Sequence, residues 1–446
     1  MKQTVFMVVL TIIGAFGAFV DPFVGLVVYY FFAALRPNAI WAWALPQLGW
    51  SEYVAIPALI AIVLHGLSTT EGPRTFRLPH LAVACFAGWL GITYLTAQNQ
   101  DVAWIALVEY LKIFTMLFAA CLVIRHVAQL KLLLLVVTAA VAYIAYEINV
   151  FYFTVGRISI ATDGFGGLDN NGAALMLAMA VPACLFIAIE TTKVWRWLYA
   201  ALIPIVLHAV LMTFSRGSMV ALLLTAPIVL MRGRRRGQLA LAAAVIAVLI
   251  PILAGTEIRS RFFSAGDYQT DGSAQARFQS WQAAYLMSLD YPVFGVGIRN
   301  SPLFSHLYGA DMEGRVIHNQ YLQVLCDGGF PSLFFYLLMI WLTWRSLRRV
   351  QRATRGRTDE VAKTAYMVAV ATECSLMVFL VGSLFLSLEF FELPYILILI
   401  GIQLPTALTV DDELQALPGE PKPVAWPQPH VFQPRHANGE PAGARS

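Results

Sequence analysis

The sequence predicts an all-α, polytopic membrane protein: a bundle of about 12 transmembrane helices with one large external loop that is partly helical. Of its 446 residues, 59% are hydrophobic and only 13% are charged, and the mean hydropathy is +0.68. Apolar runs of about 17 to 25 residues recur along the chain, each long enough to cross a hydrocarbon core as a helix. A barrel would instead alternate over segments of about 10 residues. This composition excludes a soluble globular domain.

The apolar runs and the basic loops together predict the order and direction of the crossings. The basic stretches "MRGRRRGQ" (231–238) and "RSLRRVQRATRGR" (345–357) should be cytoplasmic, because loops rich in Lys and Arg stay inside. Residues 255–329, which lie between them, are therefore expected on the external face. The expected spans are 4–19, 22–36, 52–69, 79–97, 102–124, 130–155, 172–190, 194–213, 217–232 and 239–254, followed by spans near 330–346, 362–388 and 394–410.

The first 36 residues do not fit this alternation if they cross twice, because the N-terminus would then lie outside. Asp21 and Pro22 interrupt the apolar run, and proline breaks a helix. We therefore expect two half-helices that make one crossing, with both chain ends cytoplasmic. The alternative is about 13 spans with an external N-terminus.

These segments predict four regions. Residues 1–254 form an N-terminal transmembrane bundle, 255–329 a large external loop carrying the site, and 330–410 the C-terminal transmembrane helices. Residues 411–446 are Pro-rich and charged and are predicted to be a disordered cytoplasmic tail. The five cysteines are scattered without a CxxC pair, so neither a disulfide framework nor a zinc site is indicated.

Three residues at the predicted external edge are candidates for chemistry. Arg216 begins the helix that leads to a basic inner loop; it either reaches lipid headgroups or binds phosphate through its paired donors. Arg277, Trp281 and Tyr285 follow at i, i+4 and i+8 on one face of an amphipathic helix, and Arg277 is either a solvated loop residue or directed toward a site. His318 precedes a helix beginning near Asn319, where an imidazole can exchange protons near neutral pH; a structural histidine is the alternative.

Other charged residues are weaker candidates. Asp311 and Glu313 in "DME" are the nearest approach to a metal motif, but solvated carboxylates are commoner, and no metal is predicted. Glu109 and Lys112 are spaced i, i+3 and could neutralise each other within a span, whereas Glu373 has no evident partner in the sequence. Further external cations that could meet phosphates are Arg157, Arg299 and Arg315.

The stretches "SRGSMVALLL", "ARFQSWQAAYLMSLDYPVFGVG" and "HNQYLQVLCDGGFPSL" resemble successive landmarks of the O-antigen ligase/polymerase superfamily of bacterial membrane glycosyltransferases. His318, Asn319 and Gly329 match the ligase pattern, and Ser332 stands where that pattern has Gly, Thr or Tyr. The stretch "LDNNGAALMLAMAVP" (168–182) also resembles a segment that begins a helix in this superfamily.

The resemblance implies an O-antigen ligase in the inner membrane of a Gram-negative bacterium, with its active site facing the periplasm. It would transfer O-antigen polysaccharide from undecaprenyl pyrophosphate to a lipid A core sugar, with inversion and without a metal or cofactor. His318 would be the base, and Arg216 and Arg277 would hold the pyrophosphate, as Asn319, Arg157, Arg299 and Arg315 also could. The implied partners are the glycan donor, the lipid A core and membrane lipids, with no nucleic acid.

Three alternatives stay open at this point. O-antigen polymerases carry Arg-x10-Gly patterns in two external loops, and only Arg261 to Gly272 fits one here. A protein O-oligosaccharyltransferase would share the donor and the catalytic groups. A secondary transporter belongs to a different class and typically shows repeats and paired broken helices, neither of which is evident in the sequence.

Overall fold

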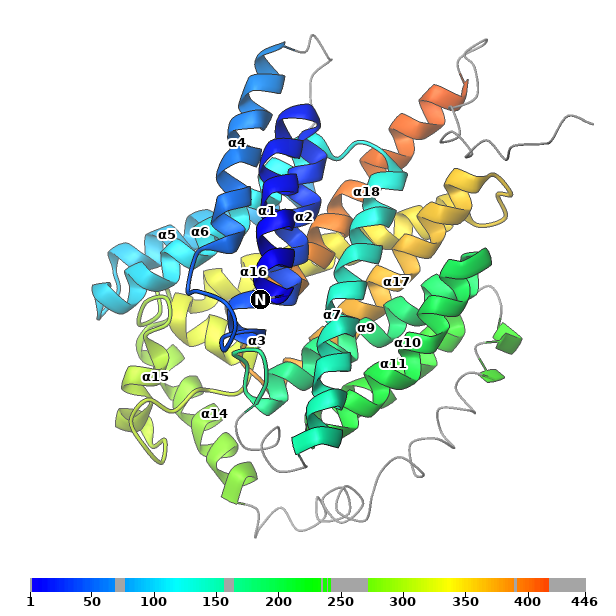
Figure 1. Cartoon of the computed structure of the whole chain (residues 1–446). Helices are drawn as coiled ribbons and strands as arrows, with labels where there is room; N and C mark the ends of the chain where they lie inside the picture. The colour runs from blue at the N-terminus through cyan, green and yellow to red at the C-terminus, as the bar shows by residue number, and fades with distance from the viewer. Residues whose placement is uncertain are drawn as a thin grey trace, which may run out of the picture.

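The computed structural model describes residues 2–68, 77–155, 164–233, 236–238, 240–241, 272–388 and 391–416, and these residues are mainly α-helical (Figure 1). Ten of the described helices are long and apolar enough to cross a membrane, which confirms the predicted all-α polytopic class. The predicted span at 239–254 lies largely outside the described residues. The elements are α1 (Lys2–Val20), α2 (Pro22–Leu35), α3 (Pro37–Ile40), α4 (Trp50–Ser68), α5 (Leu78–Leu95), α6 (Gln100–Val123), α7 (Val127–Val155), α9 (Asn170–Glu190), α10 (Lys193–Met212), α11 (Arg216–Arg232), α14 (Gly272–Asp290), α15 (Ser301–Phe304), the 3₁₀ turn η2 (Ser305–Tyr308), α16 (Gln320–Thr354), α17 (Glu360–Gly382) and α18 (Glu392–Ala416).

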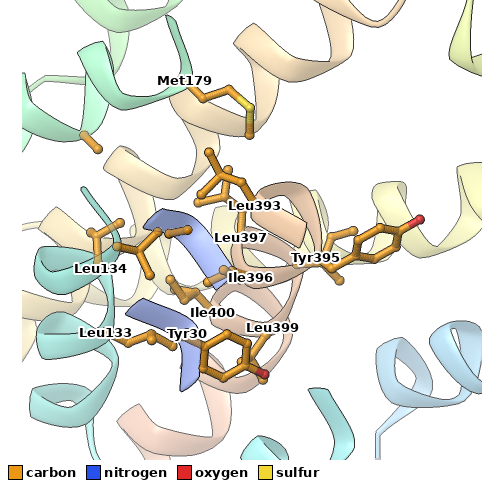
Figure 2. Close-up of a cluster of buried hydrophobic side chains, with 14 of the residues drawn as sticks. Tyr30, Leu133, Leu134, Met179, Leu393, Tyr395, Ile396, Leu397, Leu399 and Ile400 are labelled. Carbon is orange, nitrogen blue, oxygen red and sulfur yellow. The ribbon is translucent and has the colours of Figure 1, made fainter. Parts of the chain in front are cut away.

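Helices α9, α17 and α18 form the centre of the bundle. Every residue of α9 from Gly172 to Ile189 is buried, so this helix is surrounded by protein and not by lipid. The first two turns of α18 pack among side chains of α2, α7 and α9, as Figure 2 shows for Tyr30, Leu134 and Met179. The Tyr30 hydroxyl donates to the Met116 carbonyl at 3.0 Å. A polar group buried at this depth thus has a partner, as it must where water is absent.

The N-terminal helices correct the predicted single crossing. Helices α1 and α2 lie side by side and antiparallel: a Cβ on Gly17 would lie 2.8 Å from the Val24 side chain, and one on Gly14 would lie 2.8 Å from that of Val28. Each is apolar enough to be a separate span. The Asp21 side chain caps α2 by accepting from the Phe23 N–H at 2.9 Å. The break thus reverses the chain, because small residues on α1 let the two backbones approach closely.

The N-terminus therefore lies at the end of the bundle that also carries His318, hereafter the His318 end. The Thr4 hydroxyl donates to the Ala44 carbonyl at 3.1 Å, and this segment meets the loop before α9, where a Cβ on Gly167 would lie 3.1 Å from the Ala39 side chain. This placement matches the alternative topology. The last described residue, Ala416, is at the opposite end of the bundle, because α18 ends at the basic loops.

Helix α18 continues to Ala416, past the predicted boundary at 411. Asp411 accepts from the His126 ring at 2.6 Å and from the Val127 N–H at 2.9 Å. Asp412 pairs with Arg357 at 2.7 Å. These carboxylates fasten the last turns of α18 to two loops at the basic end, and residues 417–446 lie outside the described part of the chain.

Candidate active site

His318 is fixed immediately before the first turn of α16. Asn319 caps this helix, its side-chain oxygen accepting from the Tyr321 and Leu322 N–H groups at 3.0 and 3.1 Å. Such caps satisfy backbone donors that have no partner within the helix. His318 itself has a φ of 56°, in the left-handed region that non-glycine residues rarely adopt. Strain of this kind clusters at functional sites.

The surroundings of His318 favour its neutral imidazole. Its Nδ1 is buried and has no hydrogen-bond partner among the described residues, although buried polar atoms are nearly always paired. Burial lowers the pKa of His318, and the positive charges of Arg277 and Arg315 lower it further, whereas Asp169 opposes them. The ring is therefore neutral at pH 7, which is the form that can act as a base.

The short segment between α17 and α18, residues 383–388, joins three helix N-termini at this point. The Ser383 carbonyl accepts from the Gln320 N–H at 2.8 Å, and the Leu388 N–H donates to the Gln320 side chain at 2.7 Å. The same segment also contacts the starts of α9 and α11: Cβ atoms on Gly172 and Gly217 would lie 3.2 and 3.3 Å from its side chains. Because a helix N-terminus carries partial positive charge, this meeting point attracts anions.

Arg216 is the first residue of α11, and the residues just before it are hydrogen-bonded to the start of α9. The Ser215 hydroxyl donates to the Asn171 side chain at 2.8 Å, and the Asn170 amide donates to the Thr213 carbonyl at 3.2 Å. These contacts bring Arg216 to the His318 end, although it precedes His318 by a long stretch of sequence. The side chain of Arg216 is half-buried.

Arg277 reaches the site because α14 packs on α16 (Figure 1). A small apolar cluster holds the two together, with Ala284, Met287 and Cys326 at its centre and Trp281 at its edge. Arg277 lies on the packed side of α14, in line with the buried Ser280 and Ala284. The prediction that Arg277, Trp281 and Tyr285 share one face of the helix is only partly correct, since Tyr285 points outward with 55% of its surface exposed.

Gly329 has a structural role, because α16 is kinked there and the segment 292–297 docks on the kink. Pro331 has no N–H for the Asp327 carbonyl, which accepts instead from the Gly297 N–H at 3.0 Å, while the Phe330 N–H donates to the Pro292 carbonyl at 2.8 Å. The Trp89 indole donates to the Gly328 carbonyl at 2.8 Å. Gly329 has a φ of 72°, and a Cβ there would lie 2.1 Å from the Val293 oxygen.

The remaining predicted residues occupy less central positions. Arg315 pairs with Asp311, its Nε lying 2.6 Å from Oδ1, and this contact lowers the pKa of Asp311. Arg299 is half-buried in a segment that the Asn300 side chain fastens to the Asn99 N–H at 2.7 Å. Arg157 lies outside the described residues.

Asp169 is a site residue that sequence reasoning missed. It caps α9 by accepting from the Gly172 N–H at 2.8 Å, and its charge raises the pKa of His318. The stretch "LDNNGAALMLAMAVP" contained the signal, because Asp before a helical run is a typical cap, but the chain gave no sign that the charge of this cap acts on His318.

The described structure is thus a multi-pass helical membrane protein with a histidine and arginines gathered at one end of its bundle. Residues 202–337 match the model of a family described as O-Antigen ligase, and this match supports the resemblance of the chain to the O-antigen ligase/polymerase superfamily. The matched segment contains Arg216, Arg277, His318 and Gly329. The family that this segment matches implies a membrane glycosyltransferase-like enzyme that acts on lipid-linked glycans. No curated protein matches the chain.

Proposed function

We propose that the chain is an O-antigen ligase, transferring O-antigen polysaccharide from undecaprenyl pyrophosphate to a lipid A core sugar at the periplasmic face of the inner membrane. The observation that carries this proposal is the buried, unbonded Nδ1 of His318 at the meeting point of three helix N-termini. A base is needed beside an anion site, and the reacting ends of two lipid substrates emerge at the membrane surface. The placement of His318 beside these helix N-termini at one end of the bundle supports this proposal.

In this mechanism the acceptor hydroxyl attacks the anomeric carbon as its proton passes to His318. The bond from that carbon to the pyrophosphate oxygen breaks, and the electron pair leaves with undecaprenyl pyrophosphate. Attack opposite the leaving group inverts the anomeric centre. Arg216, Arg277 and the N-terminal ends of α9, α11 and α16 offset the charge developing on the leaving oxygen, which is the role we propose for them instead of a divalent metal.

The charges around His318 match the order of these events. Before the donor binds, burial and the positive charges of Arg277 and Arg315 lower the pKa of His318 and so favour the neutral ring. Once pyrophosphate occupies the arginines, its negative charge offsets theirs, and the pKa of His318 rises toward the value that a proton acceptor needs. Asp169 then stabilises the imidazolium that forms.

The test is glycan transfer by the purified full chain in detergent, with lipid-linked glycan as donor and lipid A core as acceptor. We expect His318→Ala to lose about 10²- to 10⁴-fold in rate, the usual contribution of a general base. Arg216→Ala and Arg277→Ala should lose rate through weaker stabilisation of the leaving group. Chelator should leave the wild-type rate unchanged, and His306→Ala, a loop histidine in η2, is the matched control.

Three outcomes would contradict the proposal. Undiminished transfer by His318→Ala would remove the base. Growth of the glycan on its lipid carrier, with none on lipid A core, would indicate a polymerase. Transfer to a protein hydroxyl in place of the core sugar would indicate an oligosaccharyltransferase.

A further inference from the structure

A second polar site lies at the basic end of the bundle, opposite His318. A pocket of about 400 Å³ opens where α11 ends, between the last turns of α16 and the side of α17. This volume is within the range of about 300 to 1,000 Å³ that small-molecule sites occupy. Five arginines line the pocket: Arg232, Arg236, Arg348, Arg352 and Arg355.

A fully buried carboxylate, Glu373, holds residues that line this pocket. Glu373 on α17 accepts from Arg232 at 3.2 Å, from the Trp344 indole at 2.9 Å and from the Gln351 amide at 2.6 Å. The Gln351 oxygen in turn accepts from Arg348 at 2.7 Å. One carboxylate thus holds two arginines from different helices in fixed positions, so the pocket is a built site and not merely a basic surface.

The pocket keeps a strong positive charge after its internal pairing. Glu373 contributes one negative charge, and the C-terminal ends of α11 and α16 contribute roughly half a charge each. Within the described part of the chain, no carboxylate pairs with Arg236, Arg352 or Arg355. The topological preference for basic cytoplasmic loops explains the arginines, but it does not explain their arrangement around a buried carboxylate.

The pocket lies beside aromatic residues typical of a membrane interface. Arg345 lies over the Trp341 ring at 5.3 Å, and the Trp344 indole donates to Glu373. The exposed side chain of Met231 and the ring of Tyr366 add apolar surface to the pocket wall. Guanidinium groups bind phosphate through paired donors. We propose that this pocket binds the phosphate of an anionic phospholipid headgroup, independently of the glycan-transfer site.

The test measures binding of short-chain phosphatidylglycerol to the full chain in neutral detergent. Bound lipid is counted by native mass spectrometry, and the thermal unfolding midpoint gives a second readout. Phosphatidylcholine of the same chain length controls for the acyl chains, and inorganic phosphate controls for a soluble ligand. The test variant is Arg352→Gln/Arg355→Gln. The matched control is Arg349→Gln, which changes an exposed arginine of α16 outside the pocket.

We expect phosphatidylglycerol to bind and raise the unfolding midpoint in the wild type and in Arg349→Gln, with at least about tenfold weaker binding in the double variant. Phosphatidylcholine should bind more weakly, because its headgroup carries no net charge. An equal response to inorganic phosphate, also lost in the double variant, would keep the phosphate site but assign a soluble ligand. Equal lipid binding by the wild type and the double variant would overturn the site, as would an equal loss in Arg349→Gln.

Discussion

At the scale of single residues, the His318 end combines a strained backbone, an unbonded ring nitrogen and charges of both signs. The side-chain oxygen of Asn319 caps α16. This cap holds the preceding residue, His318, at the start of the helix. The proposed substrate contact of Asn319 thus has only its amide nitrogen to use. The roles of His318, Arg216 and Arg277 remain predictions.

The pH dependence of transfer tests these charges with two variants that should shift the pKa of His318 in opposite directions. The acid limb of kcat/KM should lie below the ordinary histidine pKa of about 6.5, because burial and Arg277 lower the pKa of His318 and the neutral ring is the active form. Arg277→Gln removes a positive neighbour and should move this limb to higher pH. Asp169→Asn keeps a capping side chain but removes a negative neighbour, so the limb should move to lower pH.

Residual activity suffices for this measurement, since the position of the limb is read and not its height. If both variants leave the acid limb in place, the titrating group is not His318.

At the scale of elements, α16 serves both ends of the molecule. Its first turn presents His318, its kink at Gly329 accepts the 292–297 segment, and its last turns line the arginine pocket. The kink follows from local chemistry, because Pro331 removes a donor and Gly329 permits the left-handed backbone. The docked segment also continues from α14, so the kink helps to place Arg277.

Gly329→Ala should destabilise the protein and reduce transfer. Its Cβ would meet the Val293 carbonyl oxygen, and relieving that clash would break the hydrogen bonds at the kink, for a total cost of about 3 kcal/mol or more. Gly314→Ala is the matched control, because Gly314 has a similar φ of 75° with nothing within 4 Å of a Cβ, so it should cost only the backbone strain of about 1 to 2 kcal/mol. The thermal unfolding midpoint in detergent measures both variants, and equal losses would show that the close approach does not matter.

At the scale of the whole molecule, the bundle separates two charged sites. The N-termini of α9, α11 and α16 meet at one end, and the arginine pocket lies at the other. The antiparallel pair α1 and α2 places the N-terminus at the His318 end. This arrangement predicts that the N-terminus and the loops of the His318 end lie on one side of the membrane, and the basic loops on the other.

Cysteine labelling in intact cells tests this sidedness with an impermeant thiol reagent. Lys2→Cys should label from the same side as Leu307→Cys, which replaces an exposed residue of the His318 end. Thr358→Cys, in the exposed loop after α16, should label only after permeabilisation. The wild type provides the background, since its five cysteines are buried or half-buried. If Lys2→Cys, like Thr358→Cys, is labelled only after permeabilisation, the N-terminus lies on the side of the basic loops, and the single N-terminal crossing is correct.

Much of the architecture could be predicted from the sequence because its causes are local. A helix that crosses lipid must satisfy its own backbone and expose apolar side chains, so length and hydropathy indicate each span. The basic loops and the break at Asp21 and Pro22 are likewise visible in the chain. The pair of Glu109 and Lys112 was also predicted, and their side chains meet at 3.1 Å.

Only the tertiary structure decided which helices meet. Glu373 had no partner in the sequence, yet it pairs with Arg232 on another helix. The charge of Asp169 acts on His318 although α9 and α16 are far apart along the chain. The break at Asp21 was evident, but whether the chain reversed there depended on the small residues that let α1 and α2 touch. The physical reason is the same in each case: hydropathy shows that a face is buried, whereas packing between distant segments decides what buries it.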